Sequence, residues 1–533
     1  MHKAYIPYRA TGYFSKLICD YLEEKPSLAN FYNRFPSLDN FKGQIEEKRA
    51  NYNQASRSVL VDALQLQYAG VQLSKQTSLN LDLLRTPDSF TITTGHQLNL
   101  FTGPLYFLYK IIDTIKLTKE LKERYPEQHF IPVYWMASED HDFEEINYFN
   151  FQGKKVQWNQ VKKGAVGRLP TEGLDHVFKV FSEALGNTDA ANEIKRLFRT
   201  AYVQHKTLTA ASRWLVNELF GNQGLVIIDG DDSRLKQLLI PYIQKDIFEH
   251  TPYKYVTETI RSLTALSDDY KIQVNPREIN YFYLRDGLRE RIVEKNGTYM
   301  VKDTDLKFSR QELEKELRQF PERFSPNVIA RPLYQEVILP NLCYIGGGGE
   351  LAYWLELKQY FNHLRVSFPM LLLRSSLLLV DEKQAKKVAK LGLTIPDLFL
   401  KQSSLINKKI REVSNIDIDF SEQKKHLEQQ FEALYELAKQ TDVTFLNAVK
   451  AQEVKQKNGL DVLEKRLLKA QKQKLKDHVV RLTELQNQLF PNHSLQERQL
   501  NFSEIYVRLG QNPIVELSKH IAPLANQFLV LRI

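Results

Sequence analysis

The residues from Phe90 to Glu145 constrain the fold of this chain most strongly. Phe90–Thr94 is rich in β-branched residues and is followed by Gly95, which predicts a β-strand. The next apolar residues recur at helical spacing up to Pro126, namely Leu105, Leu108, Ile112 and Ile115. Phe130–Met136 then predicts a second strand. Because the two strands of such a strand–helix–strand unit are nearly always parallel, we expect an α/β fold with a parallel sheet core.

Both predicted strands lead into polar turns. Gly95-His96-Gln97 follows the first strand, and Glu139-Asp140-His141-Asp142 follows the second. Ligands of parallel sheets bind beyond the carboxyl ends of the strands, so we expect the two turns to share one binding edge. Leu225–Asp229 predicts a further buried strand, and it too is followed by acidic residues, Asp231 and Asp232.

The acidic turn from Glu139 to Glu145 has two interpretations. As a solvated helix start, its carboxylates would interact favourably with the helix dipole. As a polar site, it would let His141 act as a base that Asp140 or Asp142 orients. The position at the sheet edge favours the site, which makes Asp140, His141 and Asp142 the candidate catalytic residues. His141 is a single histidine between two aspartates, and no pair of further histidines supports it, so the motif does not indicate a metal site.

Four consecutive glycines, Gly346–Gly349, stand directly before a predicted helix that begins at Glu350. Bare backbone N–H groups at a helix start can bind a phosphate or carboxylate, whereas the same run can also form a flexible turn. The run lacks the ending of a P-loop and the spacing of a dinucleotide motif. Arg331 and Arg374 flank it in apolar surroundings. Each arginine suits either a structural ion pair or a clamp on an anionic group.

The first part of the chain has the composition of a folded core. We expect this core to cover residues 1–380, with a small antiparallel β insert at about 270–305. Lys271–Val274 is expected to be the first strand of the insert. Residues 152–170, rich in glycine and lysine, predict a loop or hairpin.

The later part is rich in Lys, Gln, Glu and Leu over residues 381–490. Its apolar residues alternate steps of three and four, which predicts an α-helical coiled coil with one or more chain reversals. The candidate reversals are residues 440–442 and 457–459. Residues 491–533 are expected to return to the core, where Phe528–Leu531 would add a last strand to the sheet.

Composition limits the compartment and the partners. The formal net charge of +9 permits an anionic partner without identifying one. The two cysteines, Cys19 and Cys343, are too few for a disulfide framework or a cysteine metal site. The longest apolar run, Phe368–Val380, is interrupted by Arg374 and is shorter than the ~20 residues of a membrane span. We therefore expect a cytoplasmic protein without a membrane anchor.

The basic helix at Lys465–Arg481 is expected to present a solvent-exposed face, and nucleic-acid binding is the minority interpretation.

Several motifs together resemble the BshC family, the cysteine ligases that complete bacillithiol biosynthesis. They are Thr94-Gly95-His96-Gln97 with Leu100–Tyr106, Pro132–Asn147, Arg331-Pro332, Gly346–Trp354 and Leu495–Arg498. The acidic motif within Pro132–Asn147 is the most specific of them. The motifs extend over most of the chain, from Thr94 to Arg498.

This resemblance implies a Rossmann-like core with inserted connecting segments, a long α-helical coiled-coil arm and a homodimer. It implies addition of cysteine to glucosaminyl-malate, through an amide bond between the cysteine carboxyl group and the glucosamine amine. ATP or another nucleotide is the expected activating cosubstrate, and no metal is expected. The candidate substrate-binding residues are Gly95, His96, Gln97, Thr102, Tyr106, Trp135, Glu139, Arg331, Gly346, Gly347, Gly348, Gly349, Glu350, Tyr353 and Arg374.

Two other functions compete with this interpretation. One is a nucleotidyl-transfer enzyme that resembles the class I cysteinyl-tRNA synthetases, but the chain lacks their His-x-Gly-His element and their Lys-Met-Ser-Lys-Ser loop. The other is a non-catalytic, dimeric coiled-coil scaffold that binds nucleic acid through its basic helix. Steeply salt-dependent RNA binding would favour the scaffold.

Overall fold

A parallel sheet of five strands organises the larger of two units in the chain. The computed structural model describes residues 3–160 and 163–533. Residues 3–378 and 494–531 form the larger unit, and residues 379–493 with 532–533 belong to the other. Residues 1–2 of the expected core and residues 161–162 of the expected loop or hairpin lie outside the described residues. The sheet has the strand order β13-β12-β2-β3-β6, and every neighbouring pair is parallel. Its strands are β2 (Ser89–His96), β3 (His129–Met136), β6 (Val226–Asp229), β12 (Asn341–Gly346) and β13 (Met370–Leu373).

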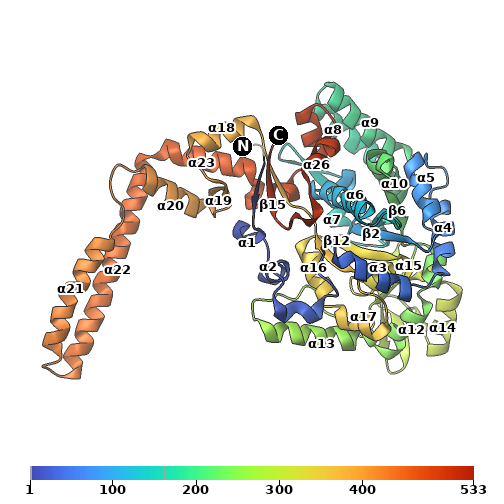
Figure 1. Ribbon diagram of the computed structural model, residues 1–533, viewed down its shortest axis with the longest axis horizontal. Helices are drawn as coiled ribbons and strands as arrows, with labels where there is room; N and C mark the ends of the chain where they lie inside the picture. The colour runs from blue at the N-terminus through green and yellow to red at the C-terminus, as the bar shows by residue number, and fades with distance from the viewer. Residues whose placement is uncertain (1–2, 161–162) are drawn as a thin grey trace. The chain divides into compact units, whose positions relative to one another are not determined.

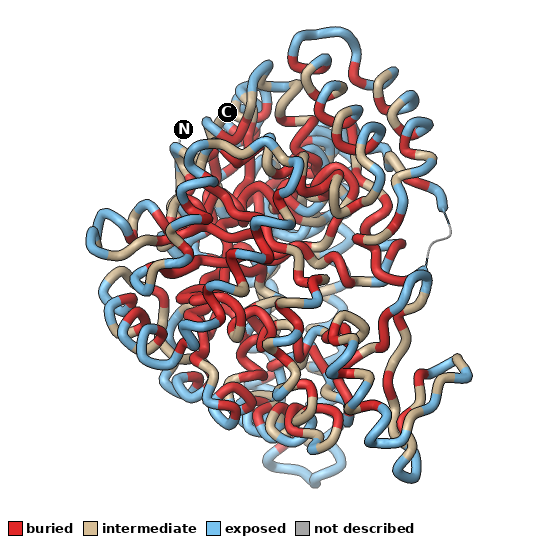
Figure 2. Tube along the Cα trace, turned by 90° about the vertical axis from the view of Figure 1, so that its right-hand side faces the viewer, coloured by how far each residue is buried: buried red, intermediate tan, exposed pale blue. Residues whose placement is uncertain are grey.

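Burial explains why these strands have such apolar sequences. Every residue of β2 and of β12 is buried, as expected for a parallel sheet covered on both faces. Phe90 and Ile92 of β2 share one apolar cluster with Leu117 and Leu121 of the helix that follows. Figure 2 shows buried residues running through the interior, with exposed residues along the outer loops and helices.

The order of the strands defines where a ligand should bind. From β2 the chain adds β3 and then β6 on one side of the sheet, and β12 and β13 on the other. The direction of winding therefore reverses between β2 and β12. In open α/β sheets the crevice at this reversal, beyond the carboxyl ends of the strands, is the usual ligand site.

Helices surround this sheet (Figure 1). The connecting helix α6 (Tyr106–Arg124) packs against both β2 and β3, which confirms the predicted strand–helix–strand unit. The N-terminal helices are α1 (Tyr8–Thr11), α2 (Lys16–Leu22), α3 (Asn40–Asn51), α4 (Ser56–Gln67) and α5 (Lys75–Leu83). Between β3 and β6 lie α7 (Phe143–Ile146), the hairpin β4 (Tyr148–Phe151) and β5 (Lys154–Gln157), α8 (Leu174–Leu185), α9 (Asp189–Gln204) and α10 (Leu208–Phe220).

The remaining helices of this unit follow β6 and end near the C-terminus. They are α11 (Ser233–Gln237), α12 (Ile240–Glu249), α13 (Thr251–Leu266), α14 (Arg310–Gln319), α15 (Ala330–Ile338), α16 (Gly348–Leu355), α17 (Lys358–Leu364), α24 (Gln496–Gln499), α25 (Phe502–Leu509) and α26 (Pro513–His520). No helix within the described parts of the chain is long and apolar enough to cross a membrane.

A second, antiparallel sheet forms the β insert. Its order is β10-β9-β8-β7-β11, with β7 (Tyr281–Arg285), β8 (Leu288–Lys295), β9 (Thr298–Val301), β10 (Lys307–Phe308) and β11 (Phe324–Pro326). The predicted strand at Lys271–Val274 is wrong, because that segment has no regular secondary structure. The carboxylate of Glu356 accepts the backbone N–H of Gln273 at 2.8 Å, so a side chain takes the place of a strand partner there.

The last strand pairs differently from the prediction. We expected Phe528–Leu531 to join the parallel sheet, but β15 (Phe528–Arg532) belongs to a three-stranded sheet of order β1-β15-β14. It runs antiparallel to β1 (Lys3–Ile6), and the third strand is β14 (Leu377–Val380). The strand pattern was correct, whereas the partner was not.

The helical arm forms the other unit. Its helices are α18 (Glu382–Lys390), α19 (Ile395–Leu398), α20 (Gln402–Val413), α21 (Ser421–Ala438), α22 (Val443–Lys474) and α23 (Lys476–Leu489). The chain reverses between α21 and α22, where Asp442 caps α22 by accepting the N–H groups of Thr444 and Phe445. Of the two candidate reversals, residues 440–442 are therefore the correct one. An apolar seam of Phe431, Ala438 and Val449 joins the two helices. Together the two units confirm the predicted class, an α/β fold with a parallel sheet and a long helical arm.

Candidate active site

A cavity of about 550 Å³ opens at the carboxyl ends of β2, β3 and β12. It therefore lies at the reversal of winding described above. Most of the residues selected from the sequence line it: Gly95, His96, Gln97, Tyr106, Trp135, Glu139, Asp140, His141, Arg331, Glu350 and Tyr353. These residues come from four separate stretches of the chain, which the fold brings together.

One end of the cavity is built around a buried lysine that sequence analysis missed. Lys110 of α6 lies 2.6 Å from the carboxylate of Glu350 and donates to the backbone oxygen of Gly95 at 2.8 Å. Burial lowers the pKa of Lys110. Burial alone would raise the pKa of Glu350, but the charge of Lys110, together with hydrogen bonds from Tyr344 and the Gly347 backbone, holds that pKa at about 2. The ammonium group has three N–H bonds, so one remains for a ligand.

Two further polar atoms at this end have no partner within residues 3–160 and 163–533. They are Nη2 of Arg331 and Nε2 of His96, and both are buried. Nη1 of Arg331 donates to the side-chain oxygen of Gln335 at 3.1 Å, and the guanidinium group also interacts with the hydroxyl of Tyr353. Burial and the neighbouring Lys110 lower the pKa of His96 to about 3, so this imidazole is neutral. A buried polar atom left unsatisfied costs roughly 1–3 kcal/mol, which a ligand atom of matching donor or acceptor character would recover.

Another part of the cavity lining is acidic. The carboxylate of Asp140 accepts the side-chain N–H of Gln97 at 2.8 Å and the backbone N–H of His141 at 2.7 Å. Burial opposes ionisation, but the hydrogen bonds from His141 and Gln97 hold the pKa of Asp140 well below its usual range. Asp140 is therefore an ionised carboxylate at any physiological pH.

His141 is held in one tautomer by an arginine of the β insert. Arg289 Nη1 lies 2.7 Å from His141 Nδ1, whereas Asp140 is 3.6 Å from the same nitrogen. A guanidinium group only donates, so Nδ1 must accept and Nε2 must carry the proton. Arg289 itself donates to Ser325 Oγ and to the backbone oxygen of Pro326, both at 3.1 Å. His141 thus presents an N–H donor toward solvent or substrate.

Glu139 forms a buried ion pair with Lys236. Burial raises the pKa of Glu139 to about 7, although Lys236 partly offsets that shift. Asp231, from the acidic end of β6, also raises it and is itself held by Arg168 at 2.7 Å. A carboxyl group with a pKa near 7 is suited to exchange protons at neutral pH.

Some of the expected site residues do not line this cavity. Asp142 is exposed just before α7. Thr102 lines a smaller neighbouring cavity. Arg374 is buried in an ion pair with Glu497 at 2.7 Å. In the glycine run Gly346–Gly349, the N–H of Gly347 donates to the carboxylate of Glu350 at 3.0 Å, so the chain itself occupies part of the expected anion nest.

The residues that sequence analysis missed differ in the signal they gave. Lys110 interrupts an apolar stretch on a helix that directly follows a site strand, and a charge at such a position is a readable sign of a buried function. Arg289 gave no local sign, because it reaches the cavity from a separate sheet. Tyr344 at the end of β12 was seen only as part of an apolar run. Its hydroxyl donates to Glu350 at 2.7 Å.

The first prediction compares Asp140 with its exposed neighbour. Asp140→Asn is expected to weaken the apparent affinity for an ammonium-bearing substrate by about 10-fold or more, because a charge-assisted hydrogen bond is lost. Asp142→Asn, the matched control two residues away, is expected to change it less than 2-fold. Initial-rate kinetics of both variants provide the measurement. Equal losses in the two variants would contradict the assignment of Asp140.

Two family models together match nearly the whole chain. Residues 1–375 match the bacillithiol biosynthesis BshC N-terminal Rossmann-like domain, and residues 377–533 match the BshC C-terminal coiled-coil domain. A protein of Christiangramia forsetii named “Putative cysteine ligase BshC” is 56% identical over 99% of this chain and 98% of its own length. Proteins with the same name from Flavobacterium psychrophilum and Bacillus mycoides are 56% and 28% identical, over 99% and 91% of this chain and 99% and 92% of their own.

A solved structure of a protein from Campylobacter jejuni, titled “putative arginyl t-RNA synthetase”, is 11% identical to this chain. The match covers 84% of this chain and 98% of the other, with a TM-score of 0.21. A likeness that low has no bearing on the fold or the function.

Proposed function

The chain belongs to the BshC family, and from that premise we propose that it is a cysteine ligase of bacillithiol biosynthesis. The bond formed is an amide between the carboxyl group of cysteine and the amine of glucosaminyl-malate. One observation supports this best: the lining of a single cavity carries both an ionised carboxylate, Asp140, and buried nitrogen atoms of Arg331 and His96 that have no partner in the described chain. Cysteine and glucosaminyl-malate both combine an amine with carboxylates, and such a cavity suits them.

The acidic end would hold the amine of cysteine. Asp140 stays ionised because Gln97 and the backbone of His141 stabilise its negative charge. An ammonium group placed against it gains a charge-assisted hydrogen bond. His141, fixed by Arg289, would donate its Nε2–H to a substrate oxygen.

The basic end would hold anionic oxygens. Arg331 Nη2 and the third N–H of Lys110 are donors that the described chain leaves free for a ligand, and the unpartnered His96 Nε2 would join them in the tautomer that places its proton there. The malate carboxylates fit these donors, and so does a phosphate group. A free carboxylate does not condense with an amine without activation, so ATP or another nucleotide is proposed as the cosubstrate that supplies the leaving group.

Glu139 is proposed as the base of the bond-forming step. The amine nitrogen of glucosaminyl-malate attacks the activated carbonyl carbon of cysteine, and a C–N bond forms. The C–O bond to the leaving phosphate or nucleotide breaks, and its electron pair leaves with that oxygen. The surplus proton of the amine passes to Glu139, whose Oε1 is bound by Lys236 and whose pKa of about 7 suits proton transfer at neutral pH.

The second prediction is the pH dependence that follows from Glu139. The base form is the carboxylate, so kcat/KM is expected to rise with pH up to about 7 and to level off above it. Glu139→Gln is expected to lower kcat by about 10²-fold or more and to remove this limb. If the rise of kcat/KM with pH instead reflected deprotonation of the substrate amine, the same rise would remain in Glu139→Gln. A pH profile that is the same in both proteins would contradict the role of Glu139.

The reaction itself is tested with the purified chain, cysteine and glucosaminyl-malate. Mass spectrometry is expected to detect bacillithiol when ATP or another nucleoside triphosphate is added, and stoichiometric release of the nucleotide product. Omission of each reactant in turn serves as the control. Formation of a cysteinyl adenylate or cysteinyl-tRNA without bacillithiol would overturn the proposal in favour of a nucleotidyl-transfer enzyme.

The homodimer remains a prediction. The α21–α22 hairpin supports it, because several large apolar side chains of the hairpin are exposed, among them Leu437, Val443 and Val454. Exposed apolar residues along a helical hairpin suit a second helical surface. Sedimentation of the full chain at increasing concentration would measure the stoichiometry.

A further inference from the structure

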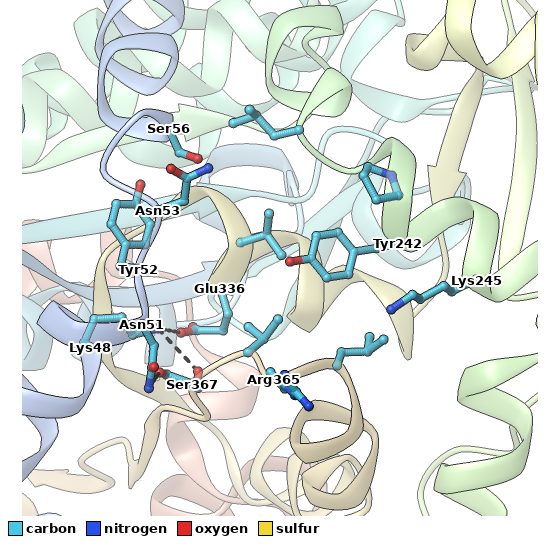
Figure 3. A pocket seen from close by; sticks show the side chains of 15 residues that line it. Lys48, Asn51, Tyr52, Asn53, Ser56, Tyr242, Lys245, Glu336, Arg365 and Ser367 are labelled. Carbon is cyan, nitrogen blue, oxygen red and sulfur yellow. Dashed lines mark hydrogen bonds and ion pairs between the residues drawn. The ribbon is translucent and has the colours of Figure 1, made fainter.

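A second cavity, of about 350 Å³, lies at the other edge of the parallel sheet (Figure 3). Glu336 and Val337 line it just before β12 begins, and Ser367 lines it just before β13 begins. These positions place the cavity at the amino ends of the strands, whereas the candidate active site lies at their carboxyl ends. The proposed ligase reaction makes no use of this cavity.

The charges around the second cavity are predominantly positive. Its charged residues are Lys48, Lys245, Arg365 and the single carboxylate Glu336. Lys48 and Glu336 are both buried and form an ion pair at 2.9 Å. Glu336 also accepts from Gln335 at 2.9 Å and from Asn341 at 2.7 Å, so its charge is already compensated within the fold.

Lys48 offers one donor to the cavity. Its ammonium group donates to Glu336 and, at 3.3 Å, to the backbone oxygen of Ser367. Two of its three N–H bonds are thereby used, and the third is free. A buried ammonium group with a spare donor is a fixed binding element, since the ion pair holds it in place.

Lys245 and Arg365 supply the uncompensated charge. Neither side chain forms a salt bridge with any residue that the structure describes. Figure 3 shows Lys245 and the hydroxyl of Tyr242 extending from α12 into the space between the labelled residues, with Arg365 at its lower border and the carboxylate of Glu336 turned toward Lys48. Arg365 ends α17 with a left-handed backbone, φ 56°.

We propose that this cavity binds a small oxyanion, the shared chemistry of phosphate and of a compact dicarboxylate. Lys245, Arg365 and the free N–H of Lys48 would surround the anion, and Tyr242 would donate its hydroxyl. A cavity of this volume is within the range of small-molecule sites. The site is distinct from the cavity of the proposed reaction and does not depend on that reaction.

Calorimetric titration of the full chain with inorganic phosphate, and separately with malate, tests the proposal. The double variant Lys245→Ala/Arg365→Ala is expected to bind the anion at least 10-fold more weakly than the wild type. Both side chains are partly or fully exposed, so the variant should fold, and circular dichroism checks this. The variant Lys254→Ala/Arg261→Ala, on exposed positions of α13, is the matched control and is expected to bind as the wild type does.

The titration must also separate the two cavities. Arg331→Met removes a donor from the candidate active site and is expected to leave binding at the second cavity intact. The two probes identify the source of the oxyanion, because phosphate and malate are expected to differ in affinity. Absence of saturable binding by both probes overturns the proposal. Binding lost in Arg331→Met but kept in Lys245→Ala/Arg365→Ala overturns it as well.

Discussion

Arg331→Met is expected to lower kcat/KM for ligation by about 10²–10³-fold, the loss typical of one donor that stabilises developing negative charge. Methionine keeps most of the volume and removes both the charge and the unpartnered Nη2. Arg331 lies with its guanidinium 5.8 Å from the ring centre of Trp135 and 5.5 Å from that of Tyr344, so its position is fixed before a substrate arrives. Steady-state kinetics on both substrates give the measurement.

The control for this prediction is an arginine that has no contact with the cavity. Arg261→Met, on the exposed side of α13, is expected to leave kcat/KM within 2-fold of the wild type. Arg331→Lys should retain part of the activity, because a lysine keeps the charge but not the planar donor pair. Wild-type activity in Arg331→Met would contradict the proposed role of Arg331 as a donor in the reaction.

Arg374→Met is expected to destabilise the larger unit by about 3–5 kcal/mol, because it leaves the carboxylate of Glu497 buried without its partner. Both side chains are almost completely excluded from solvent, with exposures of 3% and 0%. Arg374 further donates to the backbone oxygen of Ser375 at 2.9 Å, and Glu497 accepts the N–H of Leu377 at 2.9 Å. Calorimetric unfolding should show a clearly lower melting temperature.

A double variant distinguishes a structural ion pair from a substrate clamp. Arg374→Met/Glu497→Leu is expected to recover much of the lost stability, since replacing both ions by apolar groups is often neutral. If Arg374 were instead a clamp for an anionic substrate, Arg374→Met would raise KM without changing the melting temperature. That result would contradict the expected stability loss.

The strands around the site could be predicted because their signals are local. Phe90–Thr94 and Phe130–Met136 carry apolar, β-branched stretches that end in polar turns, and β2 and β3 are found at those places. The rule that parallel strands expose their carboxyl ends together then placed Gln97 beside Asp140, and the structure joins them by a hydrogen bond of 2.8 Å. The reversal of the helical arm was narrowed to two positions, and the cap at Asp442 decides between them.

The remainder could not be predicted because it depends on contacts between distant segments. Arg289 contacts His141, and Lys236 contacts Glu139, each from a different secondary-structure element. The sequence around Arg289 and Lys236 contains no pattern that indicates these contacts. The pairing of β15 with β1 joins the two ends of the chain, a choice that no local pattern encodes. The hydrogen bond from the Gly347 N–H to Glu350, in contrast, could have been predicted. A glutamate three residues after a helix-capping position, here Glu350, is a recognised acceptor for the backbone N–H of the capping residue, and this signal was in the sequence.

The two ends of helix α15 contribute lining residues to the two cavities, and this restricts which substitutions can change one cavity without changing the other. Arg331 at its start lines the cavity of the proposed reaction, and Glu336 near its end lines the other. Gln335 bridges them, since it accepts from Arg331 at 3.1 Å and donates to Glu336 at 2.9 Å. A designer who seeks a new substrate specificity should therefore vary the β2 turn or the β insert and leave Gln335 unchanged, because a substitution of this residue would alter two binding surfaces at once.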